Sequence, residues 1–349
     1  MASKRNLNKE HILVLRLSAM GDVAMTVPVL LAFTKKHPQV KITVVTRAFF
    51  SPFFSDIPNV TVLDADVYGE YSGLFGVWKL FLKLRKLKFS AVADLHDVIR
   101  TKLLRFFFWI GFTSVKKIDK GRVEKNALTS LVNKTFKQLK TTHERYADVF
   151  RSLGYELELS TEDVLKRSTL LKQESEKEFT AIGIAPFAAF SSKQYPISLM
   201  EEVVKKLAQQ KQTQLYLFGG GIKEKQQLDH WVQKYPNCVN MVQKGSFKEE
   251  LQYIQKLNVM VAMDSGNAHM AAMYGVPTVT VWGETHPFAG FAPFAQSEHC
   301  LLPDLEKYPL IPTSVYGNIS QEGYKDVMTT IAPEQLLLKI QKIIQLPKS

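Results

Sequence analysis

Short apolar runs alternate with amphipathic segments along the N-terminal half of the chain. Strands are predicted for four mainly apolar runs, at residues 12–17, 41–46, 59–63 and 90–94. Helices are predicted between them, at residues 23–36, 75–87 and 98–109. Continuous apolar runs are typical of buried parallel strands, and strand–helix alternation is typical of a doubly wound sheet.

The same alternation restarts after a charged and polar stretch at about 160–178, which we interpret as a linker. Strands are predicted at 179–185, 214–218, 259–263 and 276–281, and helices at 197–210, 224–234, 247–257 and 332–344. The pattern predicts an α/β protein of two doubly wound, Rossmann-like domains, 1–165 and 166–349. The last helix, 333–346, is also considered as packing back on the first domain. Ligands bind such sheets at the carboxyl ends of the strands, so we expect a site in a cleft between the domains.

Length and composition agree with two soluble domains. A chain of 349 residues exceeds the size at which single cores usually stop growing. Its apolar runs fall short of the roughly 20 residues that span a bilayer, and its first ten residues are polar, so we expect a cytoplasmic protein. Cys238 and Cys300 are the two cysteines, which argues against a disulfide framework.

The positive charge is concentrated in the first half. Residues 1–165 hold 26 Lys and Arg against 16 Asp and Glu, whereas residues 166–349 hold 19 against 17. The excess is densest from Lys79 to Lys125, with 13 basic and 4 acidic residues. This asymmetry predicts an anionic partner, such as a membrane surface, a phosphorylated lipid or sugar, or nucleic acid. A solvated basic face without a ligand is the alternative, and the lack of a known reader motif argues against nucleic acid.

A strand, a tight turn and a small-residue helix follow one another at residues 259–277. The apolar run ends at Asp264, and Ser265 and Gly266 form the turn before the helix that carries His269. The N–H groups at a helix N-terminus bind anions, and a glycine there lets the backbone approach a phosphate. This segment predicts a bound phosphate or diphosphate.

Asp22 follows the first predicted strand and precedes a helix. Gly21 before it permits an unusual backbone angle, and a carboxylate at this place is able to take a proton from a hydroxyl, as a general base does. An N-cap of the next helix is the structural alternative. The turn is no dinucleotide fingerprint, because it has one glycine where that motif needs three.

Other polar residues also follow predicted strands. Lys193, with Ser191 and Ser192, is suited to bind a phosphate, although a solvated loop lysine is the commoner case. Gly219 and Gly220 are a weaker signal for a nucleotide, and His96 is a candidate to orient an acceptor or a structural histidine. The pair Asp64 and Asp66 is interpreted as a surface turn, and we expect no metal site.

The motifs in this order resemble glycosyltransferase family 9, the ADP-heptose:lipopolysaccharide heptosyltransferases. Residues 12–28 (ILVLRLSAMGDVAMTVP) are similar to the N-terminal signature of the family, and 264–277 (DSGNAHMAAMYGVP) with 282–287 (WGETHP) to its second signature. Three further similar stretches are 91–95, 193–196 and 326–333. The family often carries several cysteines in the segment before its last helix, whereas this sequence has only Cys300 there.

The resemblance implies a GT-B fold and an inverting transfer of heptose from ADP-heptose to a lipid-linked acceptor of the lipopolysaccharide inner core. It places the base at Asp22, the phosphate-binding lysine at Lys193, and the donor motif at Asp264, Ser265, Gly266 and His269. A GT-B transferase for another nucleotide sugar, or a non-catalytic nucleotide-sugar binder, is the alternative.

A working hypothesis combines the resemblance with the charge asymmetry. We expect the second domain to bind the donor without a metal or other cofactor. We expect the first to bind the anionic acceptor, through Gly21, His96, Arg100 and Arg122, and to contact the inner face of the inner membrane peripherally.

Overall fold

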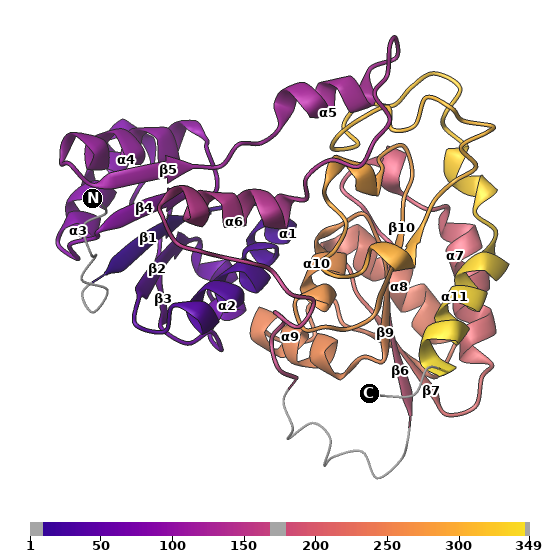
Figure 1. Ribbon diagram of the computed structural model, residues 1–349. Coiled ribbons are helices and arrows are strands. Elements are labelled where there is room, and N and C mark those ends of the chain that lie inside the picture. Colours follow the sequence, from indigo (N-terminus) through magenta and orange to yellow (C-terminus); the bar gives the residue numbers. More distant parts are fainter. Residues whose placement is uncertain (1–9, 168–178, 346–349) are drawn as a thin grey trace. The chain divides into compact units, whose positions relative to one another are not determined.

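The computed structural model describes residues 10–167 and 179–345 (Figure 1). The chain divides into two compact units. The first unit comprises Met1–Lys120 and Thr142–Leu165, and the second comprises Gly121–Thr141 and Lys166–Ser349. The predicted boundary after residue 165 therefore coincides with a change of unit, but residues 121–141 belong with the second unit and not with the first. Residues 168–178 of the predicted linker lie outside the described part.

The first unit is built on a parallel sheet with the strand order β3-β2-β1-β4-β5. Its strands are β1 (His11–Leu15), β2 (Lys41–Thr46), β3 (Val60–Asp64), β4 (Ala91–Asp94) and β5 (Ser114–Lys117). Its helices are α1 (Met20–Ala24), α2 (Thr26–Lys36), the 3-10 helix η2 (Ala48–Phe54), α3 (Gly73–Arg85), α4 (Ile99–Ile110) and α6 (Thr142–Ser152). The central strand β1 is buried over Ile12–Leu15, as its continuous apolar run predicts.

The turn after β1 differs from the prediction. The strand ends at Leu15, so Arg16 and Leu17 lie beyond it, and the predicted helix 23–36 is two helices that meet at Met25. Asp22 therefore lies inside α1 instead of before a helix. Gly21 also lies within α1, so the unusual backbone angle expected of it is not present.

The second unit is built on a parallel sheet with the order β11-β10-β9-β6-β7-β8. Its strands are β6 (Thr180–Ala185), β7 (Thr213–Leu217), β8 (Cys238–Asn240), β9 (Val259–Met263), β10 (Thr278–Val281) and β11 (Cys300–Leu301). Its α-helices are α5 (Arg122–Thr129), α7 (Ile197–Ala208), α8 (Ile222–Lys234), α9 (Phe247–Lys256), α10 (Gly266–Ala272) and α11 (Pro333–Gln345). Short 3-10 helices are η4 (Ser191–Lys193), η5 (Pro287–Ala289), η6 (Ser297–His299) and η7 (Val327–Thr330).

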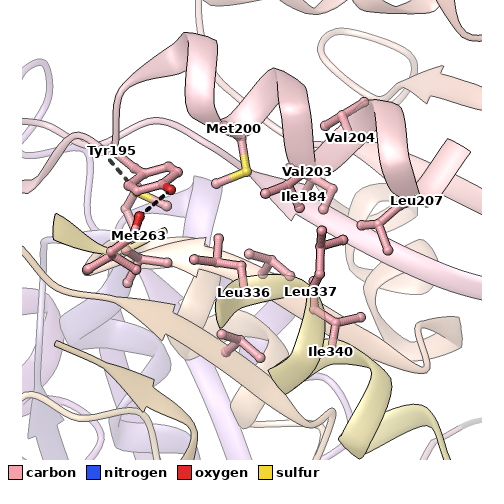
Figure 2. Close-up of a cluster of buried hydrophobic side chains, with 14 of the residues drawn as sticks. Ile184, Tyr195, Met200, Val203, Val204, Leu207, Met263, Leu336, Leu337 and Ile340 are labelled. Atoms are coloured by element: carbon pink, nitrogen blue, oxygen red, sulfur yellow. Dashed lines mark hydrogen bonds between the residues drawn. The ribbon is translucent and has the colours of Figure 1, made fainter. Parts of the chain in front are cut away.

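The main core of the second unit lies between its sheet and helices α7 and α11. Figure 2 shows Met200, Val203 and Leu207 of α7 facing Leu336 and Ile340 of α11. The apolar face of α11 is thus covered within the second unit, so this helix needs no packing on the first domain to bury it.

Tyr195 anchors the loop after β6 to this core. It is fully buried, and its hydroxyl donates a hydrogen bond to the Ile331 carbonyl at 2.6 Å (Figure 2). Because Tyr195 lies two residues after Lys193, the core fixes the backbone that carries this lysine.

The elements that the sequence pattern missed are short, polar or at sheet edges. They include β5, β8 and β11, which are edge strands of two to four residues, and helices α5 and α6. In α6 the buried Tyr146 and Phe150 form an apolar stripe among charged residues. The described helices include none that is long and apolar enough to cross a membrane.

Candidate active site

The carboxyl ends of β1 and β4 form the first of two polar sites. Strand β1 pairs with β2 on one side and with β4 on the other, so the chain reverses its direction of winding between β1 and β4. Ligands of doubly wound sheets bind at this switch point, because the loops on its two sides diverge. The residues that follow the two strands include Asp22 and His96.

The Asp22 carboxylate is held by Arg16, the residue that follows β1. Its Oδ2 lies 2.6 Å from Arg16 Nη2 and accepts a hydrogen bond from the Ala19 amide at 3.3 Å. Within the described contacts its Oδ1 accepts no hydrogen bond, and the side chain is 31% exposed. One oxygen is thus fixed while the other remains available to a hydroxyl. The N-cap alternative is partly right, because Asp22 bonds back to the cap residue, Ala19, although it is not the cap itself.

Arg16 is a functional candidate that the sequence analysis missed. It is 6% exposed, and its Nη1 donates to the Leu95 carbonyl at 2.7 Å while Nη2 pairs with Asp22. A buried guanidinium needs such a carboxylate partner. Its signal in the sequence is the single cation that interrupts the apolar run of the first strand.

His96 follows β4 and lies at the same switch point. Its Nδ1 accepts from the Leu17 amide at 3.5 Å, and its Nε2 is 3.5 Å from the Ser18 hydroxyl. Burial, with the positive charges of Arg16 and Lys120, lowers the pKa of His96 to about 3. The imidazole is therefore neutral at physiological pH.

The depressed pKa of His96 predicts a loss of stability in mild acid. The unfolded chain binds a proton at this histidine near its ordinary pKa of about 6.5, whereas the folded chain does not until about pH 3. The free energy of unfolding should therefore fall by about 1.4 kcal/mol between pH 7.5 and 5.5 on account of His96 alone. Urea unfolding of the wild type and H96N at both pH values measures this difference. H230N, at an exposed position, is the control, and an equal pH dependence in the wild type and H96N would contradict the assignment.

The basic residues of the first half differ in their surroundings. Arg105, within the stretch from Lys79 to Lys125, is used inside the first unit, where Nη1 pairs with Asp94 at 2.8 Å and with Asp97 at 3.1 Å. Arg100 donates from Nη2 to the Val67 carbonyl at 3.0 Å, and its positive charge contributes to the lowered pKa of His96. Arg122 is exposed at the start of α5 and belongs to the second unit, so its predicted place in the first domain is wrong.

The carboxyl ends of β6 and β9 form the second polar site. These strands are neighbours, and the winding reverses between them as it does between β1 and β4. Lys193 follows β6 and Asp264 follows β9, and the distance from Lys193 Nζ to Asp264 Oδ2 is 3.3 Å. The same oxygen accepts from the Thr285 hydroxyl at 2.9 Å. The structure thus joins two predicted donor residues that are 71 positions apart in the sequence.

The turn after Asp264 leads directly into α10. Ser265 is the N-cap of this helix, and its buried hydroxyl has no hydrogen-bond partner among the described residues. Gly266 is the first residue of the helix, and His269 is buried one turn later. The first N–H groups of α10 have no carbonyl partner within the helix, so this turn is able to receive an anion.

Glu284 is a second candidate that the sequence pattern did not predict. It is 1% exposed, and its carboxylate accepts hydrogen bonds from the Thr313 hydroxyl at 2.7 Å, from the backbone N–H of Gln321 at 2.8 Å and from the Ser320 hydroxyl. It therefore fixes the loop at residues 313–321. Gly317 in this loop has a φ of +81°, and a Cβ there would lie 2.7 Å from Lys193 Cγ.

The serines before Lys193 have different environments. Ser191 is exposed, whereas Ser192 is buried and its hydroxyl donates to the Gly317 carbonyl. Ser192 thus helps to hold the loop against the lysine, and its hydroxyl proton is already used.

The glycines after β7 are engaged elsewhere. The Gly220 amide donates to the Glu224 carboxylate at 2.6 Å, and an added Cβ on Gly219 would lie 3.0 Å from the same carboxylate. The Glu224 carboxylate thus already accepts the hydrogen bond of the Gly220 amide, which a nucleotide bound at these glycines would need.

The predicted surface turn at Asp66 has the geometry of a capped loop. The Asp66 carboxylate accepts from the Gly69 amide at 2.9 Å and from Tyr68 at 3.3 Å. Residues 10–167 and 179–345 contain no group of three or more His, Cys, Asp or Glu placed to hold a metal ion.

Comparison with known proteins identifies the family. The sequence model of glycosyltransferase family 9 (heptosyltransferase) matches residues 77–314, which is more than half of the chain. The lipopolysaccharide core heptosyltransferase OpsX of Haemophilus influenzae is 22% identical over 96% of this chain and 97% of its own length.

Solved structures agree on the fold. A glycosyltransferase of family 9 from Veillonella parvula has a TM-score of 0.73, at 18% identity over 98% of this chain and 99% of that one. The ADP-heptose lipopolysaccharide heptosyltransferase II of E. coli has a TM-score of 0.68, at 20% identity over 96% and 98% of the two chains. The two parallel α/β units are thus those of a GT-B protein, and the chain is a glycosyltransferase that belongs to family 9, the heptosyltransferases.

Proposed function

We propose that the protein transfers a heptose from ADP-heptose to a lipid-linked acceptor of the lipopolysaccharide inner core, with inversion at the anomeric carbon. Membership of the heptosyltransferase family supports the reaction class. The names of OpsX and heptosyltransferase II, which specify a lipopolysaccharide core and ADP-heptose, support the substrates. The Lys193–Asp264 pair at the β6–β9 switch point is the observation that carries the proposal.

In this proposal the donor diphosphate binds at the carboxyl ends of β6 and β9. Lys193 supplies a positive charge, Ser265 supplies a hydroxyl without a partner among the described residues, and the start of α10 supplies backbone N–H groups. Negative charge grows on the diphosphate as the sugar leaves, and fixed donors stabilise that charge without reorganisation. Glu284 and Gly317 keep the lysine in position through the loop at residues 313–321.

Asp22 is proposed as the general base. Its Oδ1 accepts the proton of the acceptor hydroxyl. Arg16 holds Oδ2 and thereby orients the carboxylate, much as the third residue of a catalytic triad orients the histidine. The hydroxyl oxygen then attacks the anomeric carbon, the bond to the diphosphate breaks, and ADP leaves with the electron pair. Because attack and departure take place on opposite faces of the sugar, one displacement inverts the configuration.

A transfer assay tests the proposal. The protein is incubated with an inner-core acceptor and ADP-heptose, with UDP- and GDP-sugars as competing donors. The mass of the product is then measured by mass spectrometry. The proposal predicts that the acceptor gains one heptose and that ADP is released in equal amount. Binding of ADP-heptose without turnover would instead indicate a non-catalytic nucleotide-sugar binder. Turnover with another nucleotide sugar in place of ADP-heptose would show that the proposed donor is wrong.

We expect the transfer to need no metal ion. Lys193 and the N–H groups of α10 are proposed to supply the positive charge that a divalent cation would otherwise bring to the diphosphate. ADP release should therefore be the same before and after dialysis against EDTA, and added Mg²⁺ should leave it unchanged. Activity that disappears with EDTA and returns with Mg²⁺ would contradict this part of the proposal.

A further inference from the structure

Large apolar side chains are exposed together on helices α3 and α4 of the first unit. They recur at helical spacing on each helix, and the most exposed lies in the turn after α4. The set comprises Phe75, Trp78, Phe106, Trp109, Ile110 and Phe112. Phe112 is 99% exposed and Trp109 is 65% exposed. Single exposed apolar residues are ordinary, whereas a contiguous group marks an interaction surface.

A pocket of about 530 Å³ lies within this α3–α4 face. Aromatic rings make much of its lining, with centroids 5.0 Å apart for Trp78 and Phe107 and 5.3 Å apart for Phe81 and Phe107. Arg85 and Lys88 line the same pocket. An apolar hollow with cations in its lining is suited to a molecule that has both a hydrocarbon part and a negative charge.

The segment that carries the α3–α4 face is strongly cationic in sequence. Residues 73–117 contain ten Lys and Arg but only two acidic residues, Asp94 and Asp97, and Arg105 pairs with both of these. Lys86, Lys88 and Lys102 are exposed. A partner that complements this face therefore carries dense negative charge beside apolar surface.

We propose that the α3–α4 face docks on a bilayer that contains anionic phospholipids. Aromatic side chains favour the membrane interface, where their rings enter the apolar boundary, and basic side chains reach the lipid phosphates. The inference rests on the proposed function in one respect only: the bilayer is the place where the enzyme would meet its lipid-linked acceptor. Docking itself depends on the first unit alone.

Vesicle binding tests the proposal on the full chain. Vesicles of phosphatidylcholine with phosphatidylglycerol should bind the protein, vesicles of phosphatidylcholine alone should bind it at least tenfold more weakly, and high salt should weaken the binding. Trp231 and Trp282 are buried in the second unit, so a blue shift of tryptophan fluorescence should come from Trp78 and Trp109. Brominated lipids should quench this signal, and W109F should reduce it.

Paired variants identify the surface. W109S/F112S should lower the affinity for anionic vesicles at least tenfold, because it removes the two most exposed rings near the end of α4. K86S/K88S should lower it by a similar factor through the loss of two charges. L338S and K205S/K211S, at exposed positions of the second unit, are the matched controls and should bind as the wild type does.

The outcomes also separate this proposal from the proposed function. All variants should keep the wild-type affinity for ADP and the wild-type transfer rate to a deacylated, soluble acceptor. A wild type that ignores anionic vesicles, or double variants that bind them normally, would overturn the docking proposal whatever the activity. A dimer in the absence of lipid that W109S/F112S dissociates, without vesicle binding by the wild type, would assign the face to a second copy of the chain.

Discussion

Replacing Asp22 by asparagine is expected to lower kcat by about 10²–10⁴, the usual contribution of a general base. Asparagine keeps the size of the side chain but cannot accept the proton of the acceptor hydroxyl. The affinity for ADP should stay the same, because the proposed donor residues belong to the second unit. Steady-state kinetics with ADP-heptose and acceptor, together with calorimetric titration of ADP, measure both quantities.

Two controls make the Asp22 result specific. D56N changes an exposed aspartate of the same unit and should turn over as the wild type does. Because D22N leaves the buried Arg16 without its carboxylate, its thermal unfolding must be compared with that of the wild type. A folded D22N protein with the wild-type kcat would show that Asp22 is not the base.

Replacing Lys193 by alanine is expected to weaken ADP binding by about 10- to 150-fold. A hydrogen bond to a charged group contributes about 1.5–3 kcal/mol, and each 1.4 kcal/mol is a factor of ten. Asp264, at 11% side-chain exposure, would also lose its partner and repel the diphosphate. Calorimetric titration of ADP into wild type and K193A measures the change in Kd.

Further variants separate the two causes of this loss. K193A/D264N removes the unpaired carboxylate, so it should recover the repulsive part of the loss but not the contribution of the lysine. K193M keeps an apolar stem against Gly317 and should bind ADP as weakly as K193A does, which would exclude lost packing as the cause. K211A, at an exposed site of the same unit, should bind normally. Unchanged ADP affinity in both K193A and K193M would remove Lys193 from the donor site.

The sequence predicted the central strands well because burial leaves a simple signal there. The apolar runs at 41–46 and 259–263 coincide with β2 and β9, and the run at 179–185 differs from β6 by one residue. The strands at the sheet edges are short and partly exposed, as in β5 and β11, so their sequences carry little apolar pattern. The position of residues 121–141 depends on tertiary packing, which a periodic pattern does not encode.

The two polar sites were predicted in part for a similar reason. Asp22, His96, Lys193 and Asp264 each follow a strand, and parallel strands bring their carboxyl ends to one edge of a sheet. Glu284 was missed because its partners, at residues 313–321, are distant in sequence. Arg16 was missed because the fold after β1 is what places it against both Asp22 and the Leu95 carbonyl. A count of charges along the sequence also does not show which cations are already paired, as Arg105 is with Asp94 and Asp97.

A crystal structure of the protein with bound ADP would locate the donor diphosphate. We expect the diphosphate at the carboxyl ends of β6 and β9, within hydrogen-bond distance of Lys193 Nζ and of the backbone N–H groups at the start of α10. A diphosphate bound instead at the glycines after β7, or anywhere else away from Lys193 and Gly266, would contradict it.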